Sequence, residues 1–116
     1  MPKDGIVLKD EQCRMVFNQE SFCELIKHLL KFYVGISYAE ASALVQQSHL
    51  AEPVATYMEA ALLNHEIPYY WAMSLYYGDM YWLKGIPAQP DDLEAYFRLE
   101  DDIICTYDLK EPFVDE

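Results

Sequence analysis

The three histidines are the first side chains to test for the spacing of a catalytic or metal-binding motif. His28, His49 and His65 lie outside any HExxH pattern, and no Glu-x-x-His pair of the di-iron type occurs. Glu24 and His28 are one helical turn apart, but that spacing is common among surface residues. The sequence therefore predicts no metal site, and nothing in it indicates a cofactor.

Motifs for nucleophilic catalysis and phosphate binding are also missing from the sequence. There is no GxSxG motif, the three cysteines lack CxxC spacing, and the four glycines lie too far apart for a phosphate-binding loop. An odd number of thiols is typical of reduced cysteines in a cytosolic protein. Neighbouring acids such as Asp101 and Asp102 would point in different directions on a helix, so they form no acid–base dyad. We expect a binding protein and not an enzyme.

Charge is the most informative global property of the chain. Its 116 residues fit one domain, and 20 acids against 8 Lys and Arg give a net charge of −12. Such a surface repels nucleic acid and anionic membranes and attracts a cationic partner. No apolar run reaches the roughly 18 residues of a membrane helix, and residues 1–10 have no apolar signal core. These features favour a cytoplasmic protein.

The excess of acids is concentrated in residues 91–116. Ten acids and two bases give this segment a net charge of −8, against −4 for the first 90 residues. Aromatic side chains between the acids could form the core of an interface with an acidic rim. The alternative is an ordinary solvated helix followed by a tail. The predicted partner-binding residues are Asp91, Asp92, Glu94, Tyr96, Glu100, Asp101, Asp102, Tyr107 and Asp108.

An aromatic stretch, residues 67–83, is expected to form the centre of the fold. Seven of its seventeen residues are Tyr or Trp, and Asp79 carries its only formal charge. Pro68 suits the first turn of a helix, and Gly78 suits the left-handed position after its end. A helix that is apolar nearly all round belongs inside a protein. A ligand cage built from these aromatic rings is the alternative.

The other elements are predicted to be helices joined by short turns. Residues 1–8 are expected to be a loose arm, and Asp10 to cap a short helix. Asn18 would cap a stronger helix over residues 19–34, whose apolar residues repeat at three- and four-residue steps. Ser37 and Glu40 form a capping-box pattern for a helix that runs to about His49.

The second half of the chain follows the same rules. Pro53 is expected to open a helix with Val54, Tyr57, Met58, Ala61 and Leu62 facing inward. Asp91 would cap a last helix, in which residues 103–107 are either helix or a short strand, and residues 110–116 are a tail. No hairpin signal is found. The expected fold class is all-α: one compact, irregular bundle of five or six helices, residues 1–116, around the central aromatic helix.

Part of the aromatic stretch resembles a known class of proteins. The run from Pro68 to Met73, the pair Tyr77-Gly78 and the pair Tyr81-Trp82 are similar to stretches of small bacterial immunity proteins. These are cytosolic partners of polymorphic or contact-dependent growth-inhibition toxins. The resemblance implies a stoichiometric inhibitor that docks on a toxin domain and blocks its active site or substrate path. It assigns no binding residue in this sequence.

Three hypotheses follow for the function. The first is an immunity protein that binds a cationic toxin, with a nuclease favoured because nucleases bind polyanions and tend to be basic. The second is a helical adaptor or regulatory subunit that forms homodimers through exposed aromatic residues. The third is an enzyme or small-molecule binder with a pocket between Trp71, Tyr76 and Trp82.

Overall fold

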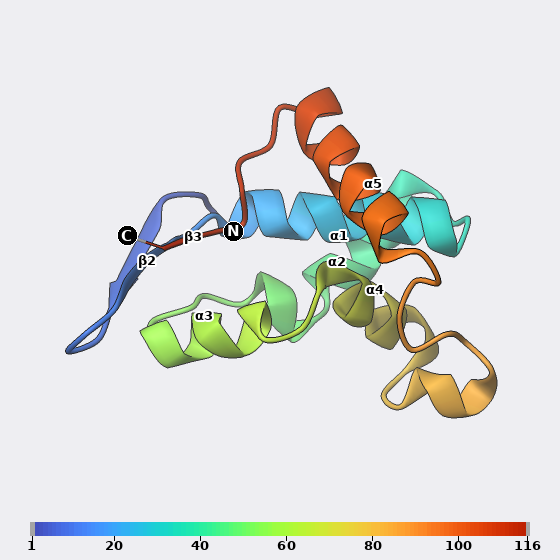
Figure 1. The fold of residues 1–116 in the computed structure, drawn as a ribbon, viewed down its shortest axis with the longest axis horizontal. Coiled ribbons are helices and arrows are strands. Elements are labelled where there is room, and N and C mark those ends of the chain that lie inside the picture. The colour runs from blue at the N-terminus through green and yellow to red at the C-terminus, as the bar shows by residue number, and fades with distance from the viewer. Residues whose placement is uncertain (1, 116) are drawn as a thin grey trace.

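The chain begins with a β-hairpin, continues through five α-helices and ends with a strand that returns to the hairpin (Figure 1). The computed structural model describes residues 2–115. The elements in chain order are β1 (Ile6–Lys9), β2 (Arg14–Phe17), α1 (Gln19–Tyr33), α2 (Tyr38–Gln46), the 3₁₀ turn η1 (His49–Ala51), α3 (Tyr57–Asn64), α4 (Pro68–Tyr77), the 3₁₀ turn η2 (Tyr81–Lys84), α5 (Leu93–Thr106) and β3 (Phe113–Asp115). No helix in this range is both long enough and apolar enough to cross a membrane.

Helix α1 lies at the centre of the fold, in place of the aromatic helix that the sequence suggested. It contacts α2, α4, α5 and η1, and nine of its residues are buried, against three in α4. Phe22, Leu25, Ile26 and Leu29 supply the apolar face that the three- and four-residue spacing predicted. The aromatic helix α4 covers one side of α1.

The aromatic stretch forms a helix that begins and ends where Pro68 and Gly78 predicted. Pro68 opens α4, and Gly78 ends it in a positive-φ conformation, at φ 93°. The buried rings of Tyr69 and Tyr81 donate hydrogen bonds from their hydroxyls to the carbonyl oxygens of Pro87 and Ala88, at 2.8 and 2.7 Å. These bonds hold the connector that leads to α5.

The prediction of a compact fold with five or six helices is confirmed with five, but the fold is not purely all-α, because the described residues include a three-stranded antiparallel sheet. The strand order is β1-β2-β3, with Leu8 opposite Met15 and Phe17 opposite Phe113. Asp10 does not cap a helix. Its carboxylate accepts hydrogen bonds from the backbone N–H groups of Gln12 and Cys13 at 2.9 and 2.7 Å, which closes the hairpin turn. An Asp side chain makes the same kind of bond in turns and at helix starts.

Segments near both ends of the described chain belong to this sheet, so part of the predicted arm and part of the predicted tail are strands. The arm contains the start of β1, and the tail contains β3; Met1 and Glu116 lie outside the described residues. Phe113 stacks on Phe17 with ring centroids 4.9 Å apart and meets Phe22 edge to face at 5.4 Å. These rings attach the sheet to the start of α1.

Asn18 also connects the two ends, although the sequence predicted a helix cap. It occupies the N-cap position of α1 without a side-chain capping bond. Its Oδ1 accepts a hydrogen bond from the Gly5 N–H at 2.8 Å, and its Nδ2 donates one to the Glu111 carbonyl oxygen at 2.6 Å. Residue 18 therefore links both terminal segments to the central helix.

The remaining helices, α2, α3 and α5, form where they were expected, with shifted bounds in all three cases. The Ser37 hydroxyl accepts from the Glu40 N–H as predicted, but α2 ends before His49. Helix α3 is capped by Thr56 and begins after the predicted Pro53 start, and its Met58 and Leu62 are exposed rather than inward-facing. Helix α5 is capped by Asp92 and not Asp91, and residues 103–106 are helical.

Candidate functional site

Five of the predicted partner-binding acids are exposed on or beside α5. Asp91 and Asp92 lie at its N-terminal end, and Glu94, Asp101 and Asp102 lie along its outer side. The Asp92 side chain accepts a hydrogen bond from the Ala95 N–H at 3.1 Å. Together with Phe97, these five acids form what we call the acidic face of α5. None of the five forms an ion pair with another described residue.

The aromatic residue of this face is Phe97 and not Tyr96, which the sequence had assigned to the interface. Phe97 is 47% exposed and lies one helical turn from Glu94 and Asp101. Tyr96 is 1% exposed, and its hydroxyl accepts a hydrogen bond from the Tyr69 N–H at 2.9 Å. Burial raises the pKa of the Tyr96 phenol, and Glu100 raises it further. Tyr96 belongs to the core.

Glu100 is partly buried and does not share the exposed position of its neighbours. It lines a cleft of about 260 Å³ together with Glu66 and Glu111, and its Oε2 is buried with no hydrogen-bond partner in the described chain. Burial is the main cause that raises the pKa of the Glu100 carboxyl. A hydrogen bond with Tyr96 lowers it in part, and Asp101 and Glu111 raise it.

Replacing Glu100 with Gln is expected to stabilise the protein at about pH 7. A carboxyl group whose pKa is higher in the folded state binds its proton more tightly there, so stability falls as pH rises from the unfolded-state value of 4.5 through the folded-state pKa. Glu100→Gln removes this loss, and its advantage in urea unfolding should vanish below pH 4.5. Asp101→Asn, an exposed neighbour, is the control. Equal effects of the two variants at both pH values would contradict the assignment.

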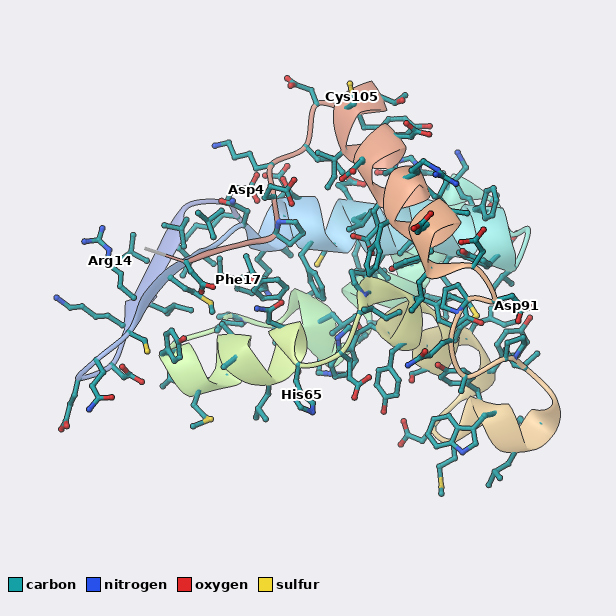
Figure 2. All side chains as sticks on the ribbon, in the orientation of Figure 1. Asp4, Arg14, Phe17, His65, Asp91 and Cys105 are labelled. Carbon is teal, nitrogen blue, oxygen red and sulfur yellow. The ribbon has the colours of Figure 1, made fainter. Side chains whose placement is uncertain are left out.

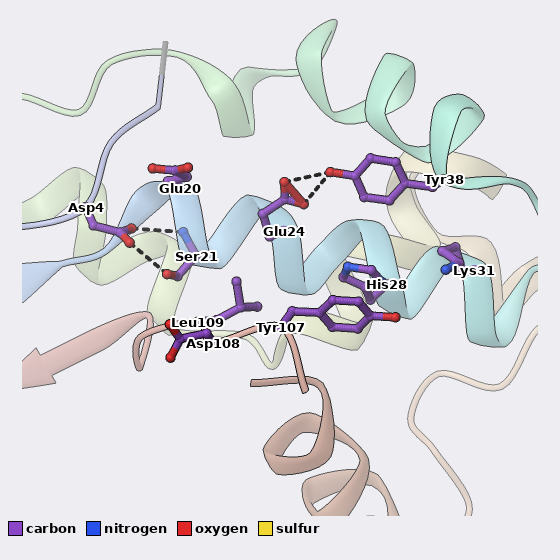
Figure 3. Close-up of a pocket in the computed structure, with 10 residues that line it drawn as sticks. All are labelled: Asp4, Glu20, Ser21, Glu24, His28, Lys31, Tyr38, Tyr107, Asp108 and Leu109. Atoms are coloured by element: carbon purple, nitrogen blue, oxygen red, sulfur yellow. Dashed lines mark hydrogen bonds between the residues drawn. The ribbon is translucent and has the colours of Figure 1, made fainter. Parts of the chain in front are cut away.

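The remaining two predicted residues, Tyr107 and Asp108, line a second hollow, which we call the acidic groove (Figure 3). The groove has a volume of about 580 Å³ and lies between α1, the N-terminal segment and the chain just after α5. Its acidic lining residues are Asp4, Glu20, Glu24 and Asp108, and Lys31 is its one Lys or Arg. The structure thus joins the end of the acidic segment to acids of α1.

Two of the groove carboxylates are held in place by hydrogen bonds. The Asp4 carboxylate accepts from the backbone N–H and the hydroxyl of Ser21, at 2.9 and 2.8 Å. The Tyr38 hydroxyl lies 2.7 and 2.8 Å from the two oxygens of Glu24, which also pairs with Lys27 at 3.4 Å. The bonds among these side chains are drawn in Figure 3. This part of the groove is therefore pre-organised to present negative charge.

One wall of the groove consists of stacked rings. His28 and Tyr107 lie nearly parallel, at 14°, with ring centroids 3.8 Å apart, and the Tyr38 ring is 5.5 Å from His28. Burial is the main cause that lowers the pKa of His28, and Lys31 lowers it further. The neutral imidazole therefore predominates at pH 7.

Most of the groove was not recognised as a site from the sequence. Glu20, Glu24 and His28 follow one another at four-residue steps, so a helical stripe of polar residues was visible in the sequence. Asp4 is joined to this stripe only by the tertiary fold. Among residues 2–115, no group of three or more His, Cys, Asp or Glu side chains is arranged to hold a metal ion.

The three residues of the alternative aromatic pocket have different environments. Trp82 lines a cleft of about 270 Å³ with Tyr70 and Tyr81, whereas the Trp71 indole N–H donates to the Leu63 carbonyl oxygen at 2.9 Å. Tyr76 is exposed and contacts the Tyr77 ring. None of the clefts that we describe contains all three side chains.

Comparison with known proteins gives no family assignment. No protein-family model matches the sequence. No curated protein is significantly similar in sequence, and no solved structure is significantly similar in fold.

Proposed function

We propose that this protein is a cytoplasmic immunity protein, which binds a cationic toxin domain and blocks its active site or substrate path. The favoured target is a nuclease domain, because the cationic site that binds a nucleic acid also attracts an acidic protein surface. In this proposal the protein is a stoichiometric inhibitor. It is not an enzyme, needs no cofactor and binds neither nucleic acid nor membrane.

The observation that carries the proposal is the unpaired negative charge around α5. The exposed carboxylates of its acidic face lack ion-pair partners in the described chain. Near the C-terminal end of α5, the acidic groove adds four more acidic side chains, of which only Glu24 forms an ion pair within residues 2–115, with Lys27. Charge of one sign accelerates association with a partner of the opposite sign. Phe97 supplies an exposed aromatic ring within the charged surface, and such rings are common at the centre of tight interfaces.

The direct test is association with the toxin domain encoded next to this protein, in a catalytically inactive form. Asp91→Lys, Asp101→Lys and Asp102→Lys in one variant should weaken the complex about tenfold at roughly 0.15 M salt, mainly through slower association. Asp92 is left unchanged because it caps α5. Surface plasmon resonance at several salt concentrations measures both rates, and the wild-type association rate should fall as salt rises.

A matched variant separates the effect of this surface on binding from the effect of the protein's net charge. Glu11→Lys, Glu52→Lys and Asp79→Lys reverse three exposed acids outside α5 and change the net charge by the same amount. This variant should retain nearly wild-type affinity. Equal weakening by both variants, or association that does not depend on salt, would contradict the proposed surface.

A homodimeric adaptor is the second candidate function. It is favoured by exposed apolar side chains around η2, away from α5. Met80, Trp82 and Leu83, in and next to η2, are 55%, 41% and 74% exposed. Exposed apolar side chains that are close together are typical of interaction surfaces. Light scattering on the pure protein distinguishes the two: a stable dimer that is lost in Trp82→Ser and Leu83→Ser, with no affinity for the toxin domain, would favour the adaptor.

A further inference from the structure

We propose that the cleft beside Glu100 receives a lysine or arginine side chain of the cationic partner, with its charged end at the Glu100 carboxylate and its alkyl part against the ring of Phe97. The inference rests on the proposed function, because it specifies one contact of the proposed complex. It differs from the contact made by the acids of the acidic face of α5, because those acids are exposed whereas Glu100 is partly buried.

Three segments that are far apart in the sequence form this cleft. Residues 64–68 connect α3 to α4, Phe97 and Glu100 lie one turn apart on α5, and residues 111–113 lead into β3. Figure 2 shows His65, one of the lining residues, at the end of α3. The cleft volume of about 260 Å³ is slightly below that of most sites for small ligands, so the cleft has room for a single side chain.

The Glu100 carboxylate is the observation that points to a ligand. It lines the cleft, and its Oε2 is shielded from solvent and has no hydrogen-bond partner in the described chain. No other carboxylate oxygen among residues 2–115 is in this state. Buried polar groups nearly always have a partner, and an unpaired buried charge is especially unfavourable. The last torsion of a glutamate is soft, so a donor in the cleft can reach either carboxylate oxygen.

The charges around Glu100 select a cation. Glu66 and Glu111 line the same cleft, and no Lys or Arg is among its lining residues. Burial is the main cause that raises the pKa of Glu100, and repulsion by Asp101 and Glu111 raises it further. A bound ammonium or guanidinium group would offset both the lost hydration and the repulsion.

The other walls of the cleft are apolar, which suits the alkyl part of a basic side chain. They consist of Ile67, Pro68, Phe97, Pro112 and Phe113. Lysine and arginine bury their alkyl stems along apolar surfaces and keep the charged end at a polar site. Phe97 is 47% exposed, so part of its ring is available to a cation. An inorganic cation would gain nothing from these walls.

The cleft can be tested with the full-length protein and capped peptides of four lysines or four arginines. Carboxyl ¹³C NMR measures the pKa of Glu100. A bound cation favours the carboxylate form, so a saturating peptide should lower this pKa by about 1, and that of the exposed Glu11 by less than about 0.3. The titratable groups that face Glu100 are Tyr33 of α1, Tyr96 and Asp101 of α5, His65 and Glu66 of the α3–α4 connection, and Glu111.

Two variants with the same loss of charge make the test specific. Glu100→Gln should weaken peptide binding about tenfold, because an amide cannot form the charged pair. Glu11→Gln removes one exposed carboxylate from the hairpin turn and should change the affinity less than about twofold. Glu100→Gln is expected to stabilise the free protein at about pH 7, so weaker binding by this variant would not result from a damaged fold.

The outcomes separate this inference from the proposed function. An unchanged pKa of Glu100 with both peptides, or equal weakening by the two variants, would overturn the cleft site. If the toxin domain binds wild type and Glu100→Gln equally well, the inference alone fails. If either peptide lowers the pKa of Glu100 as expected but no toxin domain binds, the cleft still takes a basic side chain and the proposed function fails.

Discussion

Replacing Asn18 with Ala is expected to lower the free energy of unfolding by about 3 kcal/mol. The side chain is 5% exposed and satisfies the Gly5 N–H and the Glu111 carbonyl, at 2.8 and 2.6 Å. Truncation leaves both backbone groups without these partners, and each loss in a buried setting amounts to about 1–3 kcal/mol. Urea unfolding followed by far-UV circular dichroism measures the change.

Two further substitutions define the cause of that loss. Asn18→Asp keeps an acceptor for the Gly5 N–H but places a carboxylate oxygen against the Glu111 carbonyl oxygen in place of a donor, so its loss should be at least as large as that of Asn18→Ala. Asn64→Ala changes an exposed asparagine at the end of α3 and should alter stability by less than about 0.5 kcal/mol. An Asn18→Ala protein as stable as Asn64→Ala would show that residue 18 does not hold the two terminal segments.

Replacing Phe113 with Ala should also destabilise the fold by about 3 kcal/mol, because its ring lies against Phe17 and Phe22. Its loss removes the main apolar attachment of β3. Urea unfolding gives the free energy. Amide hydrogen exchange in β2 should accelerate at the same time, because β3 pairs with residues 15–17.

Val114→Ala is the matched control for this second prediction. Val114 is in the same strand but 38% exposed, so its truncation should lower stability by less than about 1 kcal/mol. If both variants lost the same small amount, pairing of the backbone, and not the Phe113 ring, would hold β3 in place.

The helices could be predicted from the sequence because their signals are local. Helix α1 was expected over residues 19–34 and is observed over Gln19–Tyr33, since its apolar residues repeat over four turns. The Ser37–Glu40 pair and the Pro68 and Gly78 positions located α2 and α4 in the same way. The prediction of which α3 residues face inward was wrong, because both possible faces of this short helix carry apolar residues.

The sheet could not be predicted, because its information is distributed over the whole chain. Strands β1 and β2 have four residues each, and β3 pairs with β2 from the other end of the sequence, as Phe17 with Phe113. Alternation over four residues is too short to outweigh the Asp10 signal, which turns and helix starts share. Sequence periodicity carries no information about pairing partners that lie so far apart.

The sequence predicted the negative charge of the candidate site but not its three-dimensional arrangement. The acids of residues 91–116 were visible in the composition, and most of those predicted to bind are exposed. The phase of α5, which buries Tyr96 and exposes Phe97, depends on packing against α1 and α4. The acidic groove depends on Asp4 meeting Ser21 and on the chain after α5 meeting α1, so it exists only in the folded protein.

The separation of α5 into buried and exposed residues affects how such a protein can evolve. Tyr96 and Ile103 attach the helix to the core, while Asp91, Glu94, Asp101 and Asp102 are exposed. Exposed substitutions of this kind usually change stability by less than about 0.5 kcal/mol. Under the proposed function, selection could therefore change the exposed residues to match a changed partner, while the buried residues keep the scaffold constant.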